Sequence, residues 1–171
     1  MRMTEITCTC GAVALSLSGP PILVAECHCT SCRTAADRLG VAITEPNGGT
    51  RFVVQRKDRA VLQRGLEHLA AFRLTPQSGT QRIVATCCNS PIWLQFKGGH
   101  WLSLYAAQWP DGAAPGPDLR TMTRDAPDKL PDDLPNAATQ STGFMARLLW
   151  AWICMGFRNP PVADVRRVLD V

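Results

Sequence analysis

Residues 27–33 read Cys27-His28-Cys29-Thr30-Ser31-Cys32-Arg33, which places three thiols within six residues. If Cys27 and Cys29 end a β-strand, the alternation of side chains puts both sulfurs on one face. A turn through the next two residues then brings Cys32 back toward them. Thiolates around one ion stand about 2.3 Å from it and roughly 4 Å from one another, which this spacing allows. The stretch therefore predicts a metal site with three thiolate ligands.

Two other cysteine groups support this interpretation. Cys8-Thr9-Cys10-Gly11 repeats the alternate-residue spacing, and Gly11 gives the backbone freedom to bend both sulfurs toward one ion. Cys87-Cys88-Asn89-Ser90-Pro91 places two more thiols before a turn-forming run. Seven of the eight cysteines thus fall into three clusters, and only Cys154 stands apart.

Disulfides and buried free thiols are the alternatives. A disulfide framework suits small secreted chains, whereas residues 1–10 contain no apolar segment of the kind found in signal peptides. Short Cys-x-Cys and vicinal Cys-Cys loops make strained disulfides. An isolated buried thiol explains Cys154 better than it explains a triplet. Zinc is the expected ion for an all-thiolate site in a reducing compartment, with iron and iron–sulfur clusters as lesser alternatives.

Length and charge narrow the function classes. A chain of 171 residues fits one domain with an appendage. The net charge of +4 is mild and no run of lysines or arginines occurs, so nucleic-acid binding gains no support. No apolar stretch has the length needed to span a bilayer. We expect a soluble, cytoplasmic protein.

Residues 4–105 have the short apolar runs and turn residues of a β-rich domain. Thr34 to Leu39 is expected to form one helical turn after the three-thiol stretch. Strands this short are easily tied together by metal ions at their ends. The expected extended segments are residues 5–10, 12–17, 22–27, 41–44, 51–54, 69–74, 81–86, 92–96 and 101–105.

The composition changes after Trp109, which suggests three regions. Residues 1–109 form the zinc-binding β domain. Residues 110–140 form a strap or linker, because six prolines between Pro110 and Pro135 oppose both a strand ladder and a long helix. Residues 141–171 form a helical extension. Ser141 or Thr142 caps a helix that runs to about Arg158, and residues 162–169 are expected to form a second short helix.

The terminal helix is apolar around most of its circumference. Arg147, Ala151, Cys154 and Arg158 form one narrow stripe, and large apolar residues cover nearly all of the remaining surface. Such a helix must be buried against something. Three burial partners stay open from the sequence: its own domain, a second copy of the chain in a homodimer, or a membrane surface.

The order Cys-x-Cys-Gly, then Cys-His-Cys-x-x-Cys-Arg, then a late cysteine before a small-residue turn and Pro, resembles the glutathione-dependent formaldehyde-activating enzymes. Centromere protein V is among their relatives. The resemblance covers roughly residues 4–105 and implies a mainly β, Mss4-like (β-tent) fold with one or two Zn²⁺ ions per chain. It implies that Cys8 and Cys10 hold a structural zinc, and that Cys27, Cys29 and Cys32 hold a second zinc with a reactive fourth position.

The late motif departs from the family pattern. Members of the family carry Cys-x-x-Cys-Gly-Ser there, which puts Ala85 of this chain where the first cysteine belongs. Cys87 is the nearby substitute, directly beside Cys88. Adjacent residues of a strand point to opposite faces, so both bind one ion only through a turn-like kink. Two outcomes stay open: Cys87 as fourth ligand, or three thiolates with water or another group.

The resemblance implies a carbon–sulfur lyase or synthase that joins formaldehyde and glutathione as S-hydroxymethylglutathione. Thiolate ligands agree with that chemistry, because three of them leave a zinc ion a weak Lewis acid, better suited to a substrate thiol than to hydroxide. Arg33 is a candidate contact for a substrate carboxylate, with pairing to Asp37 as its alternative. His28 points away from the shared face of its neighbours and is expected to be structural, and Arg82 is expected to be a surface charge.

Two other function classes compete with the enzyme. A zinc-stabilised scaffold would bind partners through its apolar terminal helix, and its three-thiol site would be closed by a fourth protein ligand. Reversible redox sensing through Cys87 and Cys88 is a third and weaker alternative. An enzyme, in contrast, needs a pocket beside Cys27, Cys29 and Cys32 and a replaceable fourth ligand.

Overall fold

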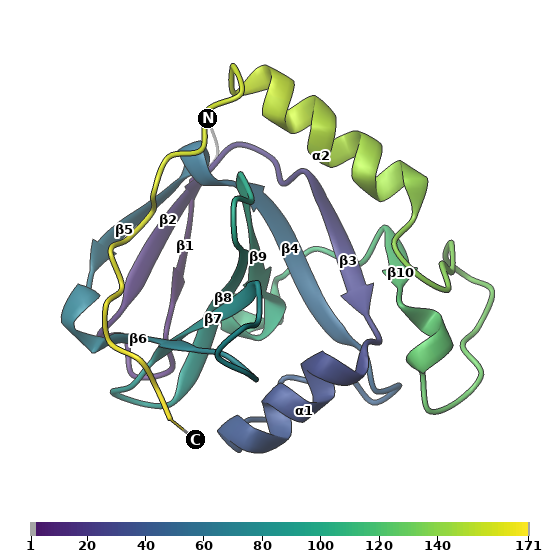
Figure 1. Ribbon diagram of the computed structural model, residues 1–171, viewed down its shortest axis with the longest axis horizontal. Coiled ribbons are helices and arrows are strands. Elements are labelled where there is room, and N and C mark those ends of the chain that lie inside the picture. The colour runs from purple at the N-terminus through teal and green to yellow at the C-terminus, as the bar shows by residue number, and fades with distance from the viewer. Residues whose placement is uncertain (1–2, 171) are drawn as a thin grey trace.

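Within residues 3–170, which the computed structural model describes, ten β-strands form two sheets (Figure 1). The order in the smaller sheet is β1-β2-β5, and the order in the larger is β10-β3-β4-β9-β8-β7-β6. The strands are β1 (Met3–Thr7), β2 (Ala14–Ser18), β3 (Leu23–Cys27), β4 (Thr50–Arg56), β5 (Ala60–Arg64), β6 (Leu69–Phe72), β7 (Thr80–Ala85), β8 (Ser90–Phe96), β9 (Trp101–Tyr105) and β10 (Leu119–Thr121). The helices are α1 (Thr30–Leu39) and α2 (Thr142–Cys154), with short 3-10 turns η1 (Lys57–Arg59), η2 (Leu66–His68), η3 (Ala106–Gln108), η4 (Pro110–Gly112) and η5 (Thr123–Asp125).

The main hydrophobic core lies between the two sheets. Ile6 and Leu15 of the smaller sheet are fully buried and pack in one cluster with Ile83 and Leu104 of the larger. Strand alternation then sends the neighbouring side chains of the larger sheet to its opposite face. That second face carries three smaller clusters, which are covered by α1 and α2 rather than by strands. The larger sheet is therefore buried on both sides.

Helix α1 begins earlier than the sequence predicts. Cys29 is its N-cap, and the Cys29 Sγ accepts a hydrogen bond from the backbone N–H of Cys32. Cys32 accordingly lies in the first helical turn, not in an irregular turn before the helix. Gly40 ends α1 in a left-handed conformation (φ 64°) that a glycine adopts without strain. The cysteine spacing thus coincides with a helix start.

Helix α2 has the predicted cap but ends sooner than expected. The Ser141 Oγ accepts the N–H of Phe144, and the helix stops at Cys154, before a left-handed Gly156. Phe144 and Leu148 pack on the second face of the larger sheet. Its own domain therefore buries only part of the apolar surface of α2. Five large apolar side chains remain substantially exposed: Met145, Leu149, Trp150, Ile153 and Phe157.

The proline-rich segment takes part in the sheet, contrary to the prediction that it joins no ladder. Its residues 119–121 form β10, which pairs in parallel with β3, Leu119 opposite Ala25 and Thr121 opposite Cys27. Asp118 fixes the register, because its Oδ2 accepts the N–H of Val24 at 2.8 Å. Three residues between prolines suffice for an edge strand. The ladder places this segment directly beside Cys27.

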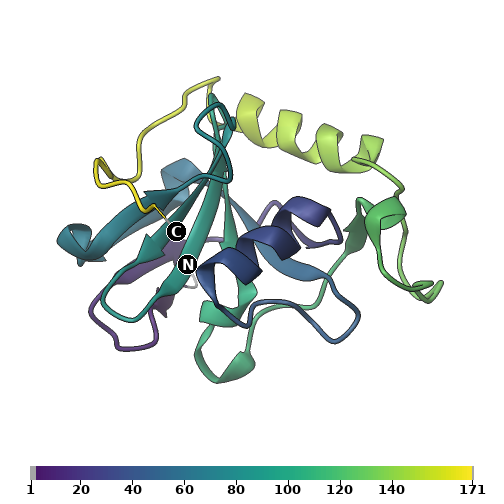
Figure 2. The same cartoon turned by 60° about the horizontal axis from the view of Figure 1, so that its bottom comes forward.

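Other differences lie at the edges of the fold. Residues 41–44 form no strand, and β5 has no counterpart in the sequence prediction. Residues 162–169 are extended rather than helical, and the chain runs past β5 to a bridge between Val168 and Ala71 of β6 (Figures 1 and 2). No helix in the described part of the chain is long and apolar enough to cross a membrane.

Candidate metal centres and an adjoining cavity

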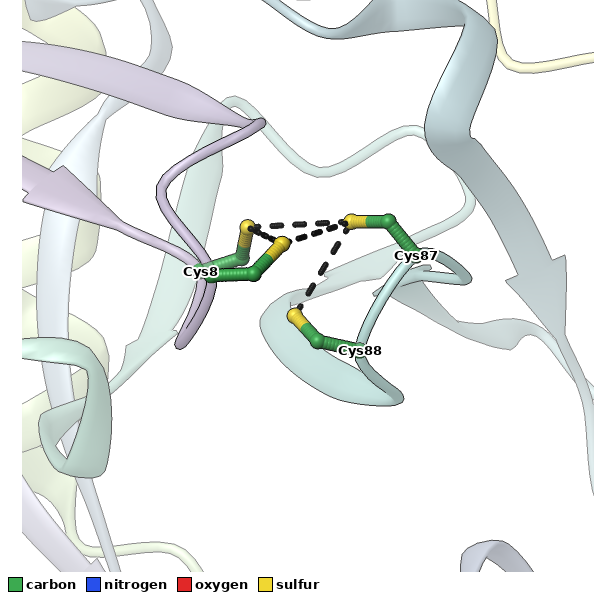
Figure 3. Close-up of side chains that lie close together, drawn as sticks. Cys8, Cys87 and Cys88 are labelled. Carbon is green, nitrogen blue, oxygen red and sulfur yellow. Dashed lines mark hydrogen bonds between the residues drawn. The ribbon is translucent and has the colours of Figure 1, made fainter.

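Four cysteines from two distant segments converge at one end of the sheets (Figure 3). Cys8 and Cys10 follow β1, whereas Cys87 and Cys88 follow β7. The Sγ atoms of Cys8 and Cys10 are 3.6 Å apart, and the Sγ of Cys87 is 3.8 Å and 3.4 Å from them. The Sγ of Cys88 completes the group, in which all four sulfurs lie within 4.8 Å of one another. Sulfurs around a tetrahedral zinc stand about 3.8 Å apart at a Zn–S distance of about 2.3 Å. We call these residues the four-cysteine cluster.

A turn lets two adjacent cysteines join this cluster. Strand β7 ends at Ala85, and the next four residues form a turn with Asn89 in the left-handed conformation at φ 54°. The kink removes the strand alternation that would point Cys87 and Cys88 apart. Ala85 is fully buried in the main core. The turn therefore brings the sulfurs of both vicinal cysteines to within 4.8 Å of those of Cys8 and Cys10.

Hydrogen bonds hold the cluster in place from both segments. The Cys8 Sγ accepts the backbone N–H of Val13 at 3.2 Å, and the Ser90 Oγ accepts the N–H of Thr9 at 3.1 Å. Burial raises the pKa of Cys88, but hydrogen bonding to Ser90 and to the Cys10 backbone outweighs it and lowers that pKa to about 6. N–H donors of this kind stabilise thiolates, the form that binds a metal.

Cys27, Cys29 and Cys32 form a second group, the three-cysteine cluster. Cys27 is the last residue of β3, Cys29 caps α1 and Cys32 lies in its first turn. All three sulfurs lie within 4.8 Å of one another, with Cys27 and Cys32 4.0 Å apart. The cluster sits at the positive end of the α1 dipole, which favours thiolates. No other His, Cys, Asp or Glu in residues 3–170 joins this group.

The electrostatics of the three-cysteine cluster fit one thiolate beside two thiols when no ion is present. Hydrogen bonds from Cys27 and Cys32 lower the pKa of Cys29 far below its usual range, and the nearby positive charge of Arg82 adds to this. Its hydrogen bond with Cys29 raises the pKa of Cys27 to about 11, and that of Cys32 also rises. Binding of a divalent ion would release the remaining two protons.

A cavity of about 420 Å³ adjoins the three-cysteine cluster. Its floor is the second face of the larger sheet, and its sides come from α1, α2 and the residues around β10. The walls are mostly apolar. The lining residues are Ala25, Cys27, Cys29, Ser31, Cys32, Phe52, Val54, Thr80, Arg82, Leu94, Phe96, Trp101, Ser103, Thr121, Met122, Gln140, Phe144, Met145 and Leu148.

Arg82 is the one cationic side chain among these lining residues. The prediction that it is a surface charge is wrong, because only 2% of the residue is exposed. Its Nη2 donates to the Ser31 carbonyl at 3.1 Å, whereas Nε and Nη1 have no hydrogen-bond partner within the described chain. The only hint in the sequence is that Arg82 alternates on β7 with Val84, which is buried on the same face.

Arg33 follows the three-cysteine cluster in the chain, but its side chain binds backbone carbonyls instead of lining the cavity. Its guanidinium donates to the backbone carbonyls of His28 and Asp125, so it ties the start of α1 to the segment after β10. It is not among the residues that line the cavity. The structure does bring the other predicted site residues together, as the two cysteine clusters.

His28 takes part in a buried polar network beside the three-cysteine cluster. Its Nε2 lies 2.9 Å from the Glu26 carboxylate, which also accepts bonds from Asn47 and from the Arg120 Nε at 3.0 Å. These bonds outweigh burial and keep the pKa of Glu26 below its ordinary value. Arg120 also contacts the exposed Asp133. The network fixes β10 and the proline-rich segment to β3.

Fold and clusters together define a class: a small two-sheet β protein whose loops converge in two cysteine groups that could each hold a metal ion. The model of the glutathione-dependent formaldehyde-activating enzyme family matches residues 3–107, and the chain belongs to this family. Its fold is accordingly the mainly β, Mss4-like fold predicted from the cysteine motifs, with α2 added beyond the matched region.

Two further comparisons add little to the family assignment. A crystal structure of a Rhodobacter sphaeroides protein is similar to this chain, with 18% sequence identity and a TM-score of 0.46. The similarity covers 63% of this chain and 88% of that one. A search of curated proteins found no match.

Proposed function

We propose that this protein is a zinc-dependent carbon–sulfur lyase or synthase that joins a small thiol to an aldehyde, or splits their adduct. Membership of the formaldehyde-activating family supports this general type of activity. One observation carries the proposal for this chain. The four-cysteine cluster offers four sulfurs to an ion, whereas the three-cysteine cluster offers three and adjoins a cavity. A fourth position beside a cavity is the arrangement of a catalytic zinc site.

Each cluster then has its own role. Cys8, Cys10, Cys87 and Cys88 hold a structural zinc that joins the two sheets. Cys27, Cys29 and Cys32 hold the catalytic zinc, which, when bound, supplies a Lewis acid that favours the thiolate form of a substrate thiol. The sulfur of that thiol adds to the aldehyde carbon, the carbonyl π bond becomes a carbon–oxygen single bond, and the oxygen takes up the proton that the thiol lost. Cleavage is the reverse.

The chain's own residues prepare this step. Helix α1 directs its N-terminal N–H groups and dipole toward the three-cysteine cluster, which stabilises negative charge on the sulfurs. The apolar cavity walls exclude water and so strengthen the local electrostatics. Thiolate ligands persist in a reducing compartment, and we place the protein in the cytoplasm.

Metal analysis and turnover measurements test the proposal. We expect two zinc ions per purified chain and consumption of formaldehyde in the presence of glutathione or other cellular thiols. Cys29→Ser should abolish turnover and remove one zinc, whereas Cys154→Ser, at an exposed cysteine outside both clusters, should change neither. A protein that holds two zinc ions and accelerates the reaction with no thiol, polar or apolar, would rule the proposal out.

A non-catalytic scaffold is the second candidate, and the exposed face of α2 favours it. Leu149, Trp150 and Phe157 are each more than half exposed, and apolar patches of this kind often mark interfaces. The partner we test is a second copy of the chain, bound through α2 as a homodimer. Light scattering after size exclusion decides: a dimer that Trp150→Glu converts to a monomer supports the interface, and a monomeric wild type excludes it.

A further inference from the structure

The cavity beside the three-cysteine cluster is completed by residues outside the region shared with the family. The family match ends at residue 107, but the cavity is also lined by Thr121 and Met122 at β10, by Gln140 just before α2, and by Phe144, Met145 and Leu148 of α2. Phe144 and Leu148 are one helical turn apart and share one side of α2. They are 9% and 2% exposed, so they form a fixed wall rather than a mobile surface.

This wall makes the cavity apolar where it faces the sheet. Phe52, Val54 and Leu94 form the opposite side, and the volume of about 420 Å³ lies within the usual range for small-molecule sites. No acidic side chain lines the cavity, and Arg82 is the single cation. Glutathione carries two carboxylates and an ammonium group. Most of these charges would enter the cavity without a partner, which is unfavourable.

Arg82 supplies the one strong polar contact. Its guanidinium is buried, its positive charge acts on both the Cys29 sulfur and the buried Tyr105 hydroxyl, and its Nε and Nη1 make no hydrogen bond of ordinary length in the described chain. Buried donors without partners are rare and are commonly completed by a ligand or water. The addition step turns a neutral carbonyl oxygen into an alkoxide before it is protonated. A donor fixed near the cluster would stabilise that developing charge.

We propose that the three-cysteine site acts on thiols with an apolar aliphatic or aromatic body, and that Arg82 receives the oxygen of their hydroxymethyl adducts. The apolar body lies between Phe144 and Leu148 of α2 and the sheet. The inference rests on the proposed carbon–sulfur activity and adds its substrate class. The C-terminal region, which the family match does not cover, sets the specificity.

Competing thiols test the substrate class. We expect kcat/KM for formaldehyde addition to be at least about tenfold higher with benzyl mercaptan than with glutathione, the usual discrimination for apolar groups in a pocket. Phe144→Ala should lower kcat/KM for benzyl mercaptan by about tenfold or more and leave that for glutathione unchanged. Leu149→Ala is the matched control, because Leu149 lies on the same helix but is 53% exposed. Higher kcat/KM with glutathione, or equal effects of the two variants, would overturn the substrate class and leave the lyase activity in place.

A binding measurement tests the proposed substrate class separately from the proposed lyase activity. Benzyl methyl sulfide has no acidic proton and undergoes no reaction, so calorimetric titration of the zinc-loaded protein reports on the cavity alone. Binding that weakens about tenfold in Phe144→Ala but not in Leu149→Ala supports the substrate class even if no thiol is turned over. In that case only the proposed activity fails. Absence of thioether binding overturns the inference.

Arg82 has a distinct kinetic signature. Arg82→Gln should lower kcat for benzyl mercaptan by about 100-fold, the usual effect of losing one donor to a developing oxyanion. It should not change the affinity for benzyl methyl sulfide, which has no oxygen. Arg82→Lys should recover part of kcat, and this variant also controls for folding. Equal loss of kcat and thioether affinity in both variants would assign Arg82 a purely structural role.

Discussion

The two cysteine clusters use similar ligands in opposite ways. The four-cysteine cluster joins loops that are far apart in the chain, and none of its four cysteines lines the cavity of about 420 Å³. The three-cysteine cluster is built from one continuous stretch, 27–32, at the junction of β3 and α1, and adjoins the apolar cavity. The difference suggests that the site with four sulfurs stabilises the fold, whereas the site with three sulfurs leaves a position open for a reaction. Asn89 connects the turn that carries Cys87 and Cys88 to the helix that carries Cys32, because its side chain donates a hydrogen bond to the carbonyl of Leu39 at the end of α1.

The largest effect is expected from breaking the four-cysteine cluster. Cys8→Ser removes a buried ligand of the proposed structural zinc, and such sites contribute much of the folding free energy in small domains. We expect Tm to fall by at least about 15 °C, since about 1 kcal/mol shifts Tm by about 3 °C in a chain of this size. Calorimetry checks this, with Cys154→Ser as control. A Tm within about 2 °C of wild type would show that the cluster holds no structural ion.

The matching change in the three-cysteine cluster should affect activity rather than folding. Cys29→Ser keeps a good N-cap for α1, because a serine oxygen can accept the Cys32 N–H in place of sulfur. We expect loss of one zinc and of turnover, with a Tm decrease well below that of Cys8→Ser. Zinc stoichiometry and thermal melts of the two variants, measured side by side, test whether the clusters differ in this way. Equal destabilisation would remove the distinction between the clusters.

The next largest effect is expected from breaking the polar network beside the three-cysteine cluster. Arg120→Met leaves the Glu26 carboxylate buried without its main cation, which costs about 3–5 kcal/mol when one partner of a buried pair is removed. Urea unfolding measures this. Asp133→Asn is the control and should cost much less than Arg120→Met, because the Asp133 side chain is 60% exposed and its ion pair is screened by solvent. A cost for Arg120→Met as small as that of the control would mean that the network does not hold β10 in place.

The smallest effect concerns the attachment of α2. His100 stacks on Trp152, and its Nε2 lies 2.8 Å from the Leu148 carbonyl, the residue that lines the cavity. Burial lowers the pKa of His100 below its ordinary value of 6.5, with a smaller contribution from the positive charge of Lys57. The native protein therefore binds fewer protons than the unfolded chain near that pH. The contribution of His100 is present above pH 6.5 and is lost as the pH falls through the lowered pKa.

Wild type and His100→Gln are compared by urea unfolding between pH 7.5 and pH 5, a range of about one unit or more on either side of the ordinary histidine pKa. We expect the stability of wild type to decrease more steeply toward pH 5, because glutamine does not titrate. Identical slopes would show that His100 is equally protonated in the folded and unfolded chains.

Much of the fold could be predicted because local chemistry decides it. Eight strands fall within or close to the expected segments, and Ser141 caps α2 as its side chain suggests. The positions of β10 and residues 162–169 could not be predicted. An edge strand of three residues carries almost no pattern of its own, and its pairing depends on Asp118 and Arg120 meeting partners on β3.

The candidate sites divide in the same way. The sequence by itself determined which cysteines cluster locally, since thiol spacing of two or three residues restricts where sulfurs can lie, and it set Ser141 at the start of α2. Only the tertiary structure decided that Cys87 and Cys88 converge with Cys8 and Cys10, that Arg82 is buried, and that most residues of α2 are exposed. The physical reason is that burial and convergence depend on which distant segments pack together. A single strand or helix does not encode its neighbours.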